Sequence, residues 1–273
     1  MTNLAILIPT HRLDLNSNEK KTLNKLTENY NKEHIYFILP EKIKNTQKTF
    51  HINCSYFDDY YFSSHRNYNK LLLSKEFFER FLNYKKILIY QLDCYLIKNF
   101  DYLDMFSEYD FVGSPHINKK KKNFNGILNG GLSLRSVKPS LEVLNSSSIY
   151  LSYITILSLI RYFRSLNRLK HFMTFIFKIC NLFLKKLFNK KSEAKFNAIF
   201  LEIFPNYFNE DIFWSLFSVM YKKNFNVIDP KVAVKFGFDK DPEELFILNN
   251  KKLPFGCHNC WSEENNKFWK KYF

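Results

Sequence analysis

Four short segments, far apart in the chain, hold the residues whose types and spacing could do chemistry. They provide an acid at the end of an apolar run, a glycine pair, an acidic pair at a helix start, and a histidine after a glycine. Together these groups could bind a divalent metal, take a proton from a hydroxyl and let a ligand approach the backbone closely. The four segments are Ile87–Cys94, Asn129–Arg135, Asn209–Trp214 and Pro254–His258.

Asp93 ends a buried apolar run, where an ionised carboxylate is costly unless it is paired or bound. One interpretation is a strand-end cap or a salt bridge. The other is a ligand for Mg²⁺ or Mn²⁺, which prefer oxygen donors and often bridge carboxylates to phosphates. We expect Asp93 to bind such a metal together with His258.

His258 lies inside a single C-x-x-C segment, between Cys257 and Cys260. A zinc site needs more ligands than this segment supplies, and a redox pair would need a strand-to-helix context at the start of a βαβ unit. The functional interpretation is therefore a neutral imidazole ligand. The alternative is a histidine with a structural role.

Asn129, Gly130 and Gly131 open another apolar run. Paired glycines let the backbone approach a ligand or adopt a positive φ, although a plain turn into a strand would also explain them. Beside a metal site, the amide and the exposed backbone groups would suit the hydroxyls of a ligand.

Glu210 and Asp211 stand at the start of a helix-like stretch, where acids interact favourably with the helix dipole and Asn209 could cap. That is the structural interpretation. In the catalytic one, Asp211 takes the proton from an attacking hydroxyl. Glu210 would then orient either that hydroxyl or the base.

The elements that must position these residues alternate along the chain. We expect a helix over residues 18–30, a second over Lys70–Tyr84, a loop over Gly113–Gly126 and a helix over Asp211–Lys222. Strands alternating with helices predict an α/β sheet with parallel strands, whose ligands bind beyond the carboxyl ends. The expected strands are Leu4–Pro9, Ile35–Leu39, Ile87–Leu92, Asp110–Val112 and Gly131–Arg135.

The bulk properties allow one large domain or two small ones and indicate no membrane-spanning helix. The chain has 273 residues, 46% of them hydrophobic, and five irregularly spaced cysteines that do not resemble a disulfide framework. Its start has no basic region before a short apolar run, so we interpret it as a strand and expect the cytoplasm. No stretch reaches the length of about 18 apolar residues that a spanning helix needs.

Residues 150–202 differ from the rest of the chain in composition. They contain ten Lys and Arg and two acidic residues, a net charge of +8 out of +15 for the whole chain. Their apolar residues recur at helical spacing. We expect a helical insertion that packs on the domain, lies on an anionic membrane surface or forms a lid that binds a partner. No known binding motif accompanies the charge, so nucleic acid is not expected as a partner.

The joint pattern resembles a bacterial domain family of unknown function that is itself similar to the GT-A glycosyltransferases. The resemblance covers residues 1–149 and 203–273 and leaves out the insertion. It implies a Rossmann-like nucleotide-binding sheet with helices on both faces. The segments that match are Tyr68–Lys70, Ile87–Cys94, Tyr109–Pro115, Asn129–Arg135, Glu210–Asp211 and Pro254–His258.

This resemblance also implies roles for individual residues. Asp93 would be the remaining acid of an Asp-x-Asp pair whose first position is Gln91, which is left to contact the sugar or the ribose. Glu210 and Asp211 resemble the acidic pair of inverting enzymes, in which the Asp is the base. The residues expected to bind the donor are Pro9, Thr10, Arg12, Asn69, Lys70, Gln91, Asp93, Asn129, Gly130 and Gly131.

The resemblance implies a glycosyltransferase that moves a sugar from a nucleotide-sugar, UDP-linked, to a glycan or lipid-linked acceptor, with Mn²⁺ or Mg²⁺ as cofactor. The pathway would be cell-surface polysaccharide synthesis at the inner face of the cytoplasmic membrane. The alternative is a non-catalytic, membrane-associated binding or scaffold protein that keeps the fold. The amide at Gln91 favours that alternative, whereas Asp211 and His258 favour the enzyme.

Overall fold

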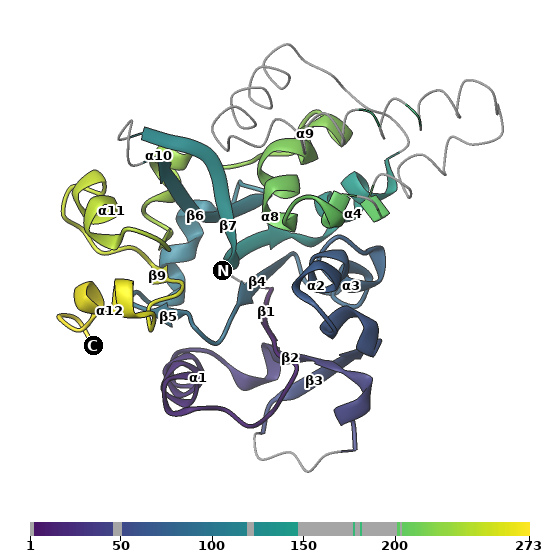
Figure 1. Ribbon diagram of the computed structural model, residues 1–273, viewed down its shortest axis with the longest axis horizontal. Coiled ribbons are helices and arrows are strands. Elements are labelled where there is room, and N and C mark those ends of the chain that lie inside the picture. The colour runs from purple at the N-terminus through teal and green to yellow at the C-terminus, as the bar shows by residue number, and fades with distance from the viewer. Residues whose placement is uncertain are drawn as a thin grey trace.

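A six-stranded sheet forms the centre of the molecule in the computed structural model, which describes residues 3–45, 51–118, 123–146, 177, 181, 201–202 and 204–273. The strand order is β3-β2-β1-β4-β7-β6 (Figure 1). The first four strands of this order are parallel, while β7 is antiparallel to β4 and β6 is antiparallel to β7. The strands are β1 (Leu4–Pro9), β2 (Ile35–Pro40), β3 (Asn53–Phe57), β4 (Lys86–Tyr90), β6 (Phe111–Asn118) and β7 (Asn123–Ser136).

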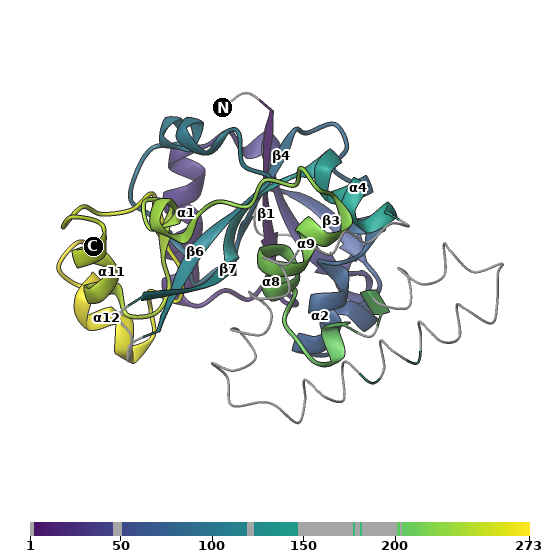
Figure 2. The same cartoon turned by 90° about the horizontal axis from the view of Figure 1, so that it is seen from above.

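Helices cover both faces of this sheet. The segment after β1 leads to β2 on one side, and the segment after β3 crosses back to β4 on the other side of β1. Right-handed crossovers in opposite directions place their helices on opposite faces, and α1 and α2 lie on either side of β1 (Figure 2). A strand covered on both faces is apolar along its whole length, and all five residues of β4 are buried.

Short helices complete the described chain. Helix α1 begins with a capping box, in which Asn16 and Glu19 each bind the other's backbone N–H. The α-helices are α1 (Ser17–Asn29), α2 (His65–Leu71), α3 (Lys75–Glu79), α4 (Val137–Asn145), α8 (Glu210–Ile212), α9 (Ser218–Tyr221), α10 (Pro230–Ala233), α11 (Pro242–Leu248) and α12 (Glu263–Trp269). The 3₁₀ turns are Lys32–His34, Glu41–Ile43, Asp59–Phe62, Phe100–Phe106 and Phe204–Asn206, and Phe213–Phe217 is a π-helix.

A smaller sheet is built from three two-residue strands, β5 (Tyr95–Leu96), β9 (Gly256–Cys257) and β8 (Gly237–Phe238). Strand β8 runs parallel to β9, with Phe238 opposite Cys257. The residues that follow these two strands, Asp239 and His258, therefore leave the sheet side by side at the same end.

Three expectations from the sequence need correction. The loop expected at Gly113–Gly126 is mostly sheet, because β6 continues to Asn118 and pairs with β7 from Asn123 onwards. The single helix expected at Lys70–Tyr84 is broken into α2 and α3, since Ser74 caps a new helix start. The sheet is also mixed rather than all parallel. The α/β class and the first strand are confirmed.

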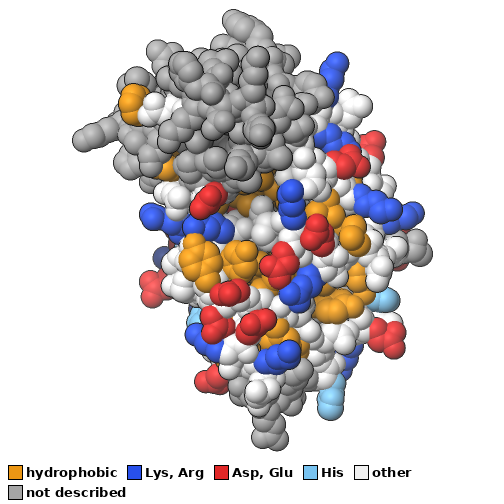
Figure 3. All heavy atoms as spheres, turned by 90° about the vertical axis from the view of Figure 1, so that its right-hand side faces the viewer, with side chains coloured by type: hydrophobic (Ala, Val, Ile, Leu, Met, Phe, Trp, Pro, Cys, Tyr) orange, Lys and Arg blue, Asp and Glu red, His pale blue; other side chains and the backbone are white. Residues whose placement is uncertain are grey.

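The described residues include no helix that is long and apolar enough to cross a membrane. Acidic and basic side chains are interspersed over the described surface on the face shown in Figure 3. About half of the net positive charge belongs to residues 150–202, and the helical insertion expected there lies almost entirely outside the described residues.

Candidate active site

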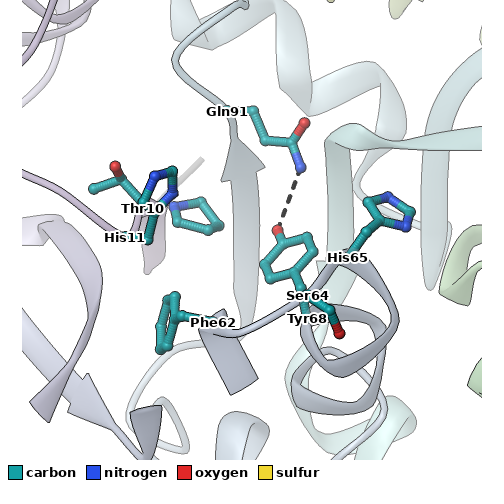
Figure 4. A pocket seen from close by; sticks show the side chains of 8 residues that line it. Thr10, His11, Phe62, Ser64, His65, Tyr68 and Gln91 are labelled. Carbon is teal, nitrogen blue, oxygen red and sulfur yellow. Dashed lines mark hydrogen bonds between the residues drawn. The ribbon is translucent and has the colours of Figure 1, made fainter. Parts of the chain in front are cut away.

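A cavity lies where the strand order of the larger sheet reverses, between β1 and β4. Ligands of open α/β sheets bind in the crevice beyond the carboxyl ends of the strands at such a point. The cavity has a volume of about 230 Å³, and Figure 4 shows its side chains. They come from the end of β1, the 3₁₀ turn Asp59–Phe62, the start of α2 and the residue after β4. The lining residues are Pro9, Thr10, His11, Phe62, Ser64, His65, Tyr68 and Gln91.

Rings surround the cavity, and polar groups lie at its edge. Phe62, Tyr68 and His11 stand around the space that Gln91 closes at one end (Figure 4). The Gln91 amide donates a hydrogen bond to the Tyr68 hydroxyl at 3.3 Å. Apolar walls with a few convergent polar groups are typical of small-molecule sites. The same hydrogen bond turns the carbonyl oxygen of Gln91 away from Tyr68.

That oxygen belongs to a second cluster, formed by Gln91, Asp93 and His258. The Nε2 atom of His258 lies 3.0 Å from Gln91 Oε1 and 3.4 Å from Asp93 Oδ1. Asp93 Oδ1 is buried and has no hydrogen-bond partner among the described residues. The N–H and the thiol of Cys260 both bond to the Asp93 carbonyl at 3.2 Å, which ties the two loops together.

Asp239 supports this cluster from behind. Its Oδ1 atom lies 2.9 Å from His258 Nδ1, and its Oδ2 accepts a hydrogen bond from the Asn129 amide at 3.2 Å. His116 Nε2 lies 3.3 Å from the same Oδ2, as an ion-pair contact without hydrogen-bond geometry. Only 2% of the Asp239 side chain is exposed, so its charge depends on these partners.

The charges in the cluster shift one another's titration. Burial alone would lower the pKa of His258, but the hydrogen bond to Asp239 and the nearby charges of Asp93 and Asp211 raise it overall. Burial alone would raise the pKa of Asp239, but its contacts with His116 and His258 hold that pKa well below the usual range. The cluster therefore keeps an ionised carboxylate beside a basic imidazole.

The glycine pair matters for space rather than for backbone angle, because neither Gly130 nor Gly131 has a positive φ. A Cβ on Gly131 would lie 2.2 Å from His258 Nε2 and 2.6 Å from Gln91 Oε1. A Cβ on Gly130 would lie 2.1 Å from a carboxylate oxygen of Glu210. The two glycines thus let the side chains of the site pack directly on β7.

Glu210 is held in a buried ion pair. Arg135 donates two hydrogen bonds to its carboxylate, at 2.9 and 3.0 Å, and the exposed fractions of the two side chains are 0% and 6%. Asn69 accepts a hydrogen bond from the Glu210 N–H at 3.2 Å. Because both carboxylate oxygens accept from Arg135, the ion pair fixes Glu210 at the start of α8.

Asp211 is the adjacent acid, and its surroundings differ. Its Oδ1 accepts a hydrogen bond from the N–H of Ile212 at 2.7 Å. Burial, followed by the charge of Glu210, raises the pKa of Asp211 to about 7. A carboxyl group whose pKa is raised toward neutral pH by burial and a neighbouring charge is typical of acid–base catalysis.

The structure brings together most of the expected site residues. The exceptions are Arg12, which pairs with Glu19 at 2.8 Å, and Lys70, which donates a hydrogen bond to the Tyr60 hydroxyl at 2.5 Å. Neither side chain lines the cavity. Both are therefore satisfied by the protein itself at some remove from the cluster.

Sequence reasoning missed Asp239 and His116. Asp239 also ends an apolar stretch, as Asp93 does, but that stretch is interrupted by Gly237 and β8 is too short to be recognised as a strand. His116 fell in a segment expected to be a loop, whereas it lies on β6 and faces the Asp239 carboxylate. Their role depends on contacts between distant segments.

A divalent cation fits one place in this arrangement. The described residues contain no group of three or more His, Cys, Asp or Glu side chains that could hold a metal. However, Asp93 Oδ1 faces His258 Nε2 without a hydrogen-bond partner, and Gln91 Oε1 is beside them. Mg²⁺ and Mn²⁺ need few protein ligands when phosphate oxygens and water complete their shell, so these three residues suit such an ion.

The fold and the site define an α/β protein with a candidate ligand site at the reversal point of its sheet. The chain belongs to the family described as "Protein of unknown function (DUF5672)", whose model matches residues 51–258. This confirms the resemblance to a family of unknown function. No curated protein matches the chain.

Two solved structures are similar to the chain. Mouse xyloside xylosyltransferase 1, in its apo form, has a TM-score of 0.43 and 8% sequence identity, and the match covers 94% of this chain and 98% of that one. The apo-form glycosyltransferase GlyE of Streptococcus pneumoniae TIGR4 has a TM-score of 0.42 and 12% identity. That match covers 99% of this chain and 60% of the other.

Proposed function

We propose that the protein is a glycosyltransferase that moves a sugar, with inversion, from a UDP-linked donor to a glycan or lipid-linked acceptor in cell-surface polysaccharide synthesis. One observation supports this most strongly. Asp93 Oδ1 and His258 Nε2 face each other at 3.4 Å beside the cavity at the sheet's reversal point. The charge of Asp211 contributes to the raised pKa of His258, which supports a base near the proposed cation site.

The donor would occupy the cavity and extend toward β7. The rings of Phe62, Tyr68 and His11 offer flat surfaces for a nucleoside. The diphosphate would then lie near Asp93, and the sugar near Asn129 and the glycine pair. Arg12 and Lys70 would have to leave Glu19 and Tyr60 to reach a phosphate, so they have no part in this proposal.

Asp93, His258 and the Gln91 carbonyl oxygen would hold a Mn²⁺ or Mg²⁺ ion. When bound, such an ion neutralises the developing charge on the departing diphosphate. The Asp239 carboxylate holds His258 in place from the opposite side of the ring. These residues therefore position the leaving group and take no proton.

Asp211 would act as the base. The acceptor oxygen forms a bond to the anomeric carbon while the bond from that carbon to the diphosphate breaks, and the acceptor proton passes to the Asp211 carboxylate. Attack on the face opposite the leaving group inverts the anomeric centre. Glu210, held by Arg135, fixes the backbone of Asp211.

Binding to an anionic membrane surface is the part of the proposal that concerns residues 150–202. Each Lys or Arg near such a surface contributes on the order of 1 kcal/mol, and ten are present in this segment. We expect the protein to co-sediment with vesicles that contain phosphatidylglycerol at low salt. At high salt it should remain in the supernatant, because the charge interaction is screened. Equal binding to neutral vesicles would refute this part alone.

Donor binding can be tested with a panel of nucleotide-sugars linked to UDP, GDP or dTDP, each with and without Mn²⁺. We expect UDP-sugars with Mn²⁺ to stabilise the protein, by about 2.7 kcal/mol at a hundredfold excess over Kd. Transfer to added saccharides should follow for the same donor. Stabilisation by none of the nucleotides would refute the proposal and favour a non-catalytic protein.

A further inference from the structure

The carboxylate of Asp239 joins four segments of the chain. It follows β8 and contacts His116 on β6, Asn129 on β7 and His258 after β9. Its backbone carbonyl accepts a hydrogen bond from the Asn265 amide at 2.8 Å. The carboxylate is almost fully buried against the imidazole that the proposed function assigns to the cation.

Asn129 fixes the orientation of this carboxylate. The N–H of Gly131 can only donate, so the Asn129 atom 2.7 Å from it is the amide oxygen. The amide nitrogen of Asn129 is therefore the group 3.2 Å from Asp239 Oδ2. With Oδ2 engaged by this donor, Oδ1 is the oxygen left to face His258 Nδ1.

The orientation of the Asp239 carboxylate decides which nitrogen of the His258 ring carries a hydrogen. An ionised carboxylate can only accept, so Nδ1 must hold a hydrogen to bond with Asp239 Oδ1 at 2.9 Å. Nε2 faces acceptors as well, Gln91 Oε1 at 3.0 Å and Asp93 Oδ1 at 3.4 Å, so a charged ring holds a hydrogen on each nitrogen. In a neutral ring the buried carboxylate of Asp239, at 2.9 Å, is the stronger acceptor and keeps the hydrogen on Nδ1. Nε2 then has the lone pair that a cation needs. Partners of this kind orient metal-binding histidines and set their tautomer.

We propose that Asp239 is a positioning residue that sets the tautomer of His258, so that Nε2 can bind a divalent cation with Asp93. The inference rests on the proposed function for the presence of that cation. The tautomer itself is a property of the protein alone. Asn129 takes part by keeping the carboxylate of Asp239 in one orientation.

The substitution Asp239→Asn tests this directly. The NH₂ of Asn129 would force the new amide to present its oxygen to Asn129 and its own NH₂ to His258. Nδ1 would then have to accept, the hydrogen of the neutral ring would move to Nε2, and the lone pair that faces Asp93 would be lost. Metal-bound histidines that lose such a partner bind the metal roughly 10- to 100-fold more weakly.

Two measurements on the full chain decide the matter. The ¹⁵N chemical shifts of the His258 ring, at an alkaline pH where the ring is neutral, should show hydrogen on Nδ1 in the wild type and on Nε2 in Asp239→Asn. Mn²⁺ affinity, measured by titration with Mn²⁺ alone, should fall roughly 10- to 100-fold in the variant. Asp110→Asn is the matched control, because it removes a carboxylate that bonds to the Asn226 N–H and leaves the cluster untouched.

If the neutral ring of wild-type His258 carries its hydrogen on Nε2, the inference is overturned, even if Asp239→Asn does not fold. An unchanged Mn²⁺ affinity in a folded Asp239→Asn protein would overturn it as well. If the wild type binds Mn²⁺ and shows the expected tautomer but transfers no sugar, the proposed function fails while the role of Asp239 stands.

Discussion

Charged side chains stand at both ends of strand β4, and their surroundings differ. At the amino end, the buried ammonium of Lys86 donates hydrogen bonds to the Tyr109 carbonyl and to the Ser136 hydroxyl. At the carboxyl end, Asp93 leaves an oxygen buried without a hydrogen-bond partner among the described residues, next to His258. The ammonium at the amino end has hydrogen-bond partners within the protein, whereas the buried oxygen at the carboxyl end has only the longer contact with His258.

This difference separates a structural charge from a binding site. Buried polar groups in folded proteins are nearly always hydrogen-bonded, and an exception needs an explanation. Burial lowers the pKa of Lys86 to about 8, which the charge of Asp110 partly opposes, and its hydrogen bonds account for its place. The unpartnered oxygen of Asp93, beside a cavity and an imidazole, is explained if a cation binds there.

If the carboxyl end of the sheet is the binding site, the largest predicted effect is the loss of transfer when Asp211 is replaced. Asp211→Asn keeps the size of the side chain but removes the proton acceptor, so transfer should fall roughly 10²- to 10⁴-fold while donor binding stays the same. Initial rates and donor titration measure the two quantities. Lys86→Met, at the opposite end of the sheet, should keep the wild-type rate. A nearly wild-type rate in Asp211→Asn would transfer the role of base to another residue.

The next effect is on stability at the site end. Arg135→Met removes one partner of a buried ion pair and leaves Glu210 charged and unpaired, so the free energy of unfolding should fall by about 3–5 kcal/mol. Urea denaturation measures it. The double variant with Glu210→Gln removes the unpaired charge and should recover much of the loss. Equal stabilities for the single and the double variant would show that the pair is not coupled.

At the amino end, stability should depend on pH through Lys86. Its folded pKa of about 8 lies below the usual lysine value, so the unfolded chain binds more protons between these values and stability rises with pH across that window. The gain is about 1.4 kcal/mol per unit of pKa difference. Lys86→Met should abolish this rise in denaturation curves taken at several pH values. If stability still rises with pH in the Lys86→Met variant, another titrating group is responsible.

The smallest predicted effect is the pH dependence of transfer. The base must be deprotonated, and the pKa of Asp211 is raised to about 7. Below that pH, kcat/KM should fall about tenfold per pH unit, and above it the rate should level off. If kcat/KM instead begins to fall only near pH 4, the ordinary pKa range for an aspartate, then Asp211 does not have the raised pKa that its burial implies.

Much of the fold could be predicted because its strands are continuous apolar runs. β1, β2 and β4 follow this rule. The predicted positions of β1 and β2 agree with the structure to within a residue, and β4 ends two residues before the predicted end. The β6–β7 hairpin did not follow it, because its outer half is polar and is stabilised by pairing between the two strands. Strands of two residues, such as β8 and β9, have no pattern that the sequence can show.

The site could be predicted only in part for a similar reason. Asp93, Asp211 and His258 each stand beside a recognisable apolar run or glycine. Asp239 and the pairing of Arg135 with Glu210 depend on segments 75 or more residues apart meeting at one end of the sheet. Contacts of this range arise from the tertiary fold and leave no local spacing in the sequence.

A structure of the protein with UDP and Mn²⁺ tests the central claim most directly. The account predicts that the diphosphate lies at the carboxyl end of β4. His258 Nε2 and a carboxylate oxygen of Asp93 should both lie within about 2.5 Å of the ion. An ordered UDP complex whose metal ion binds elsewhere, with Asp93 and His258 left uncoordinated, would contradict it.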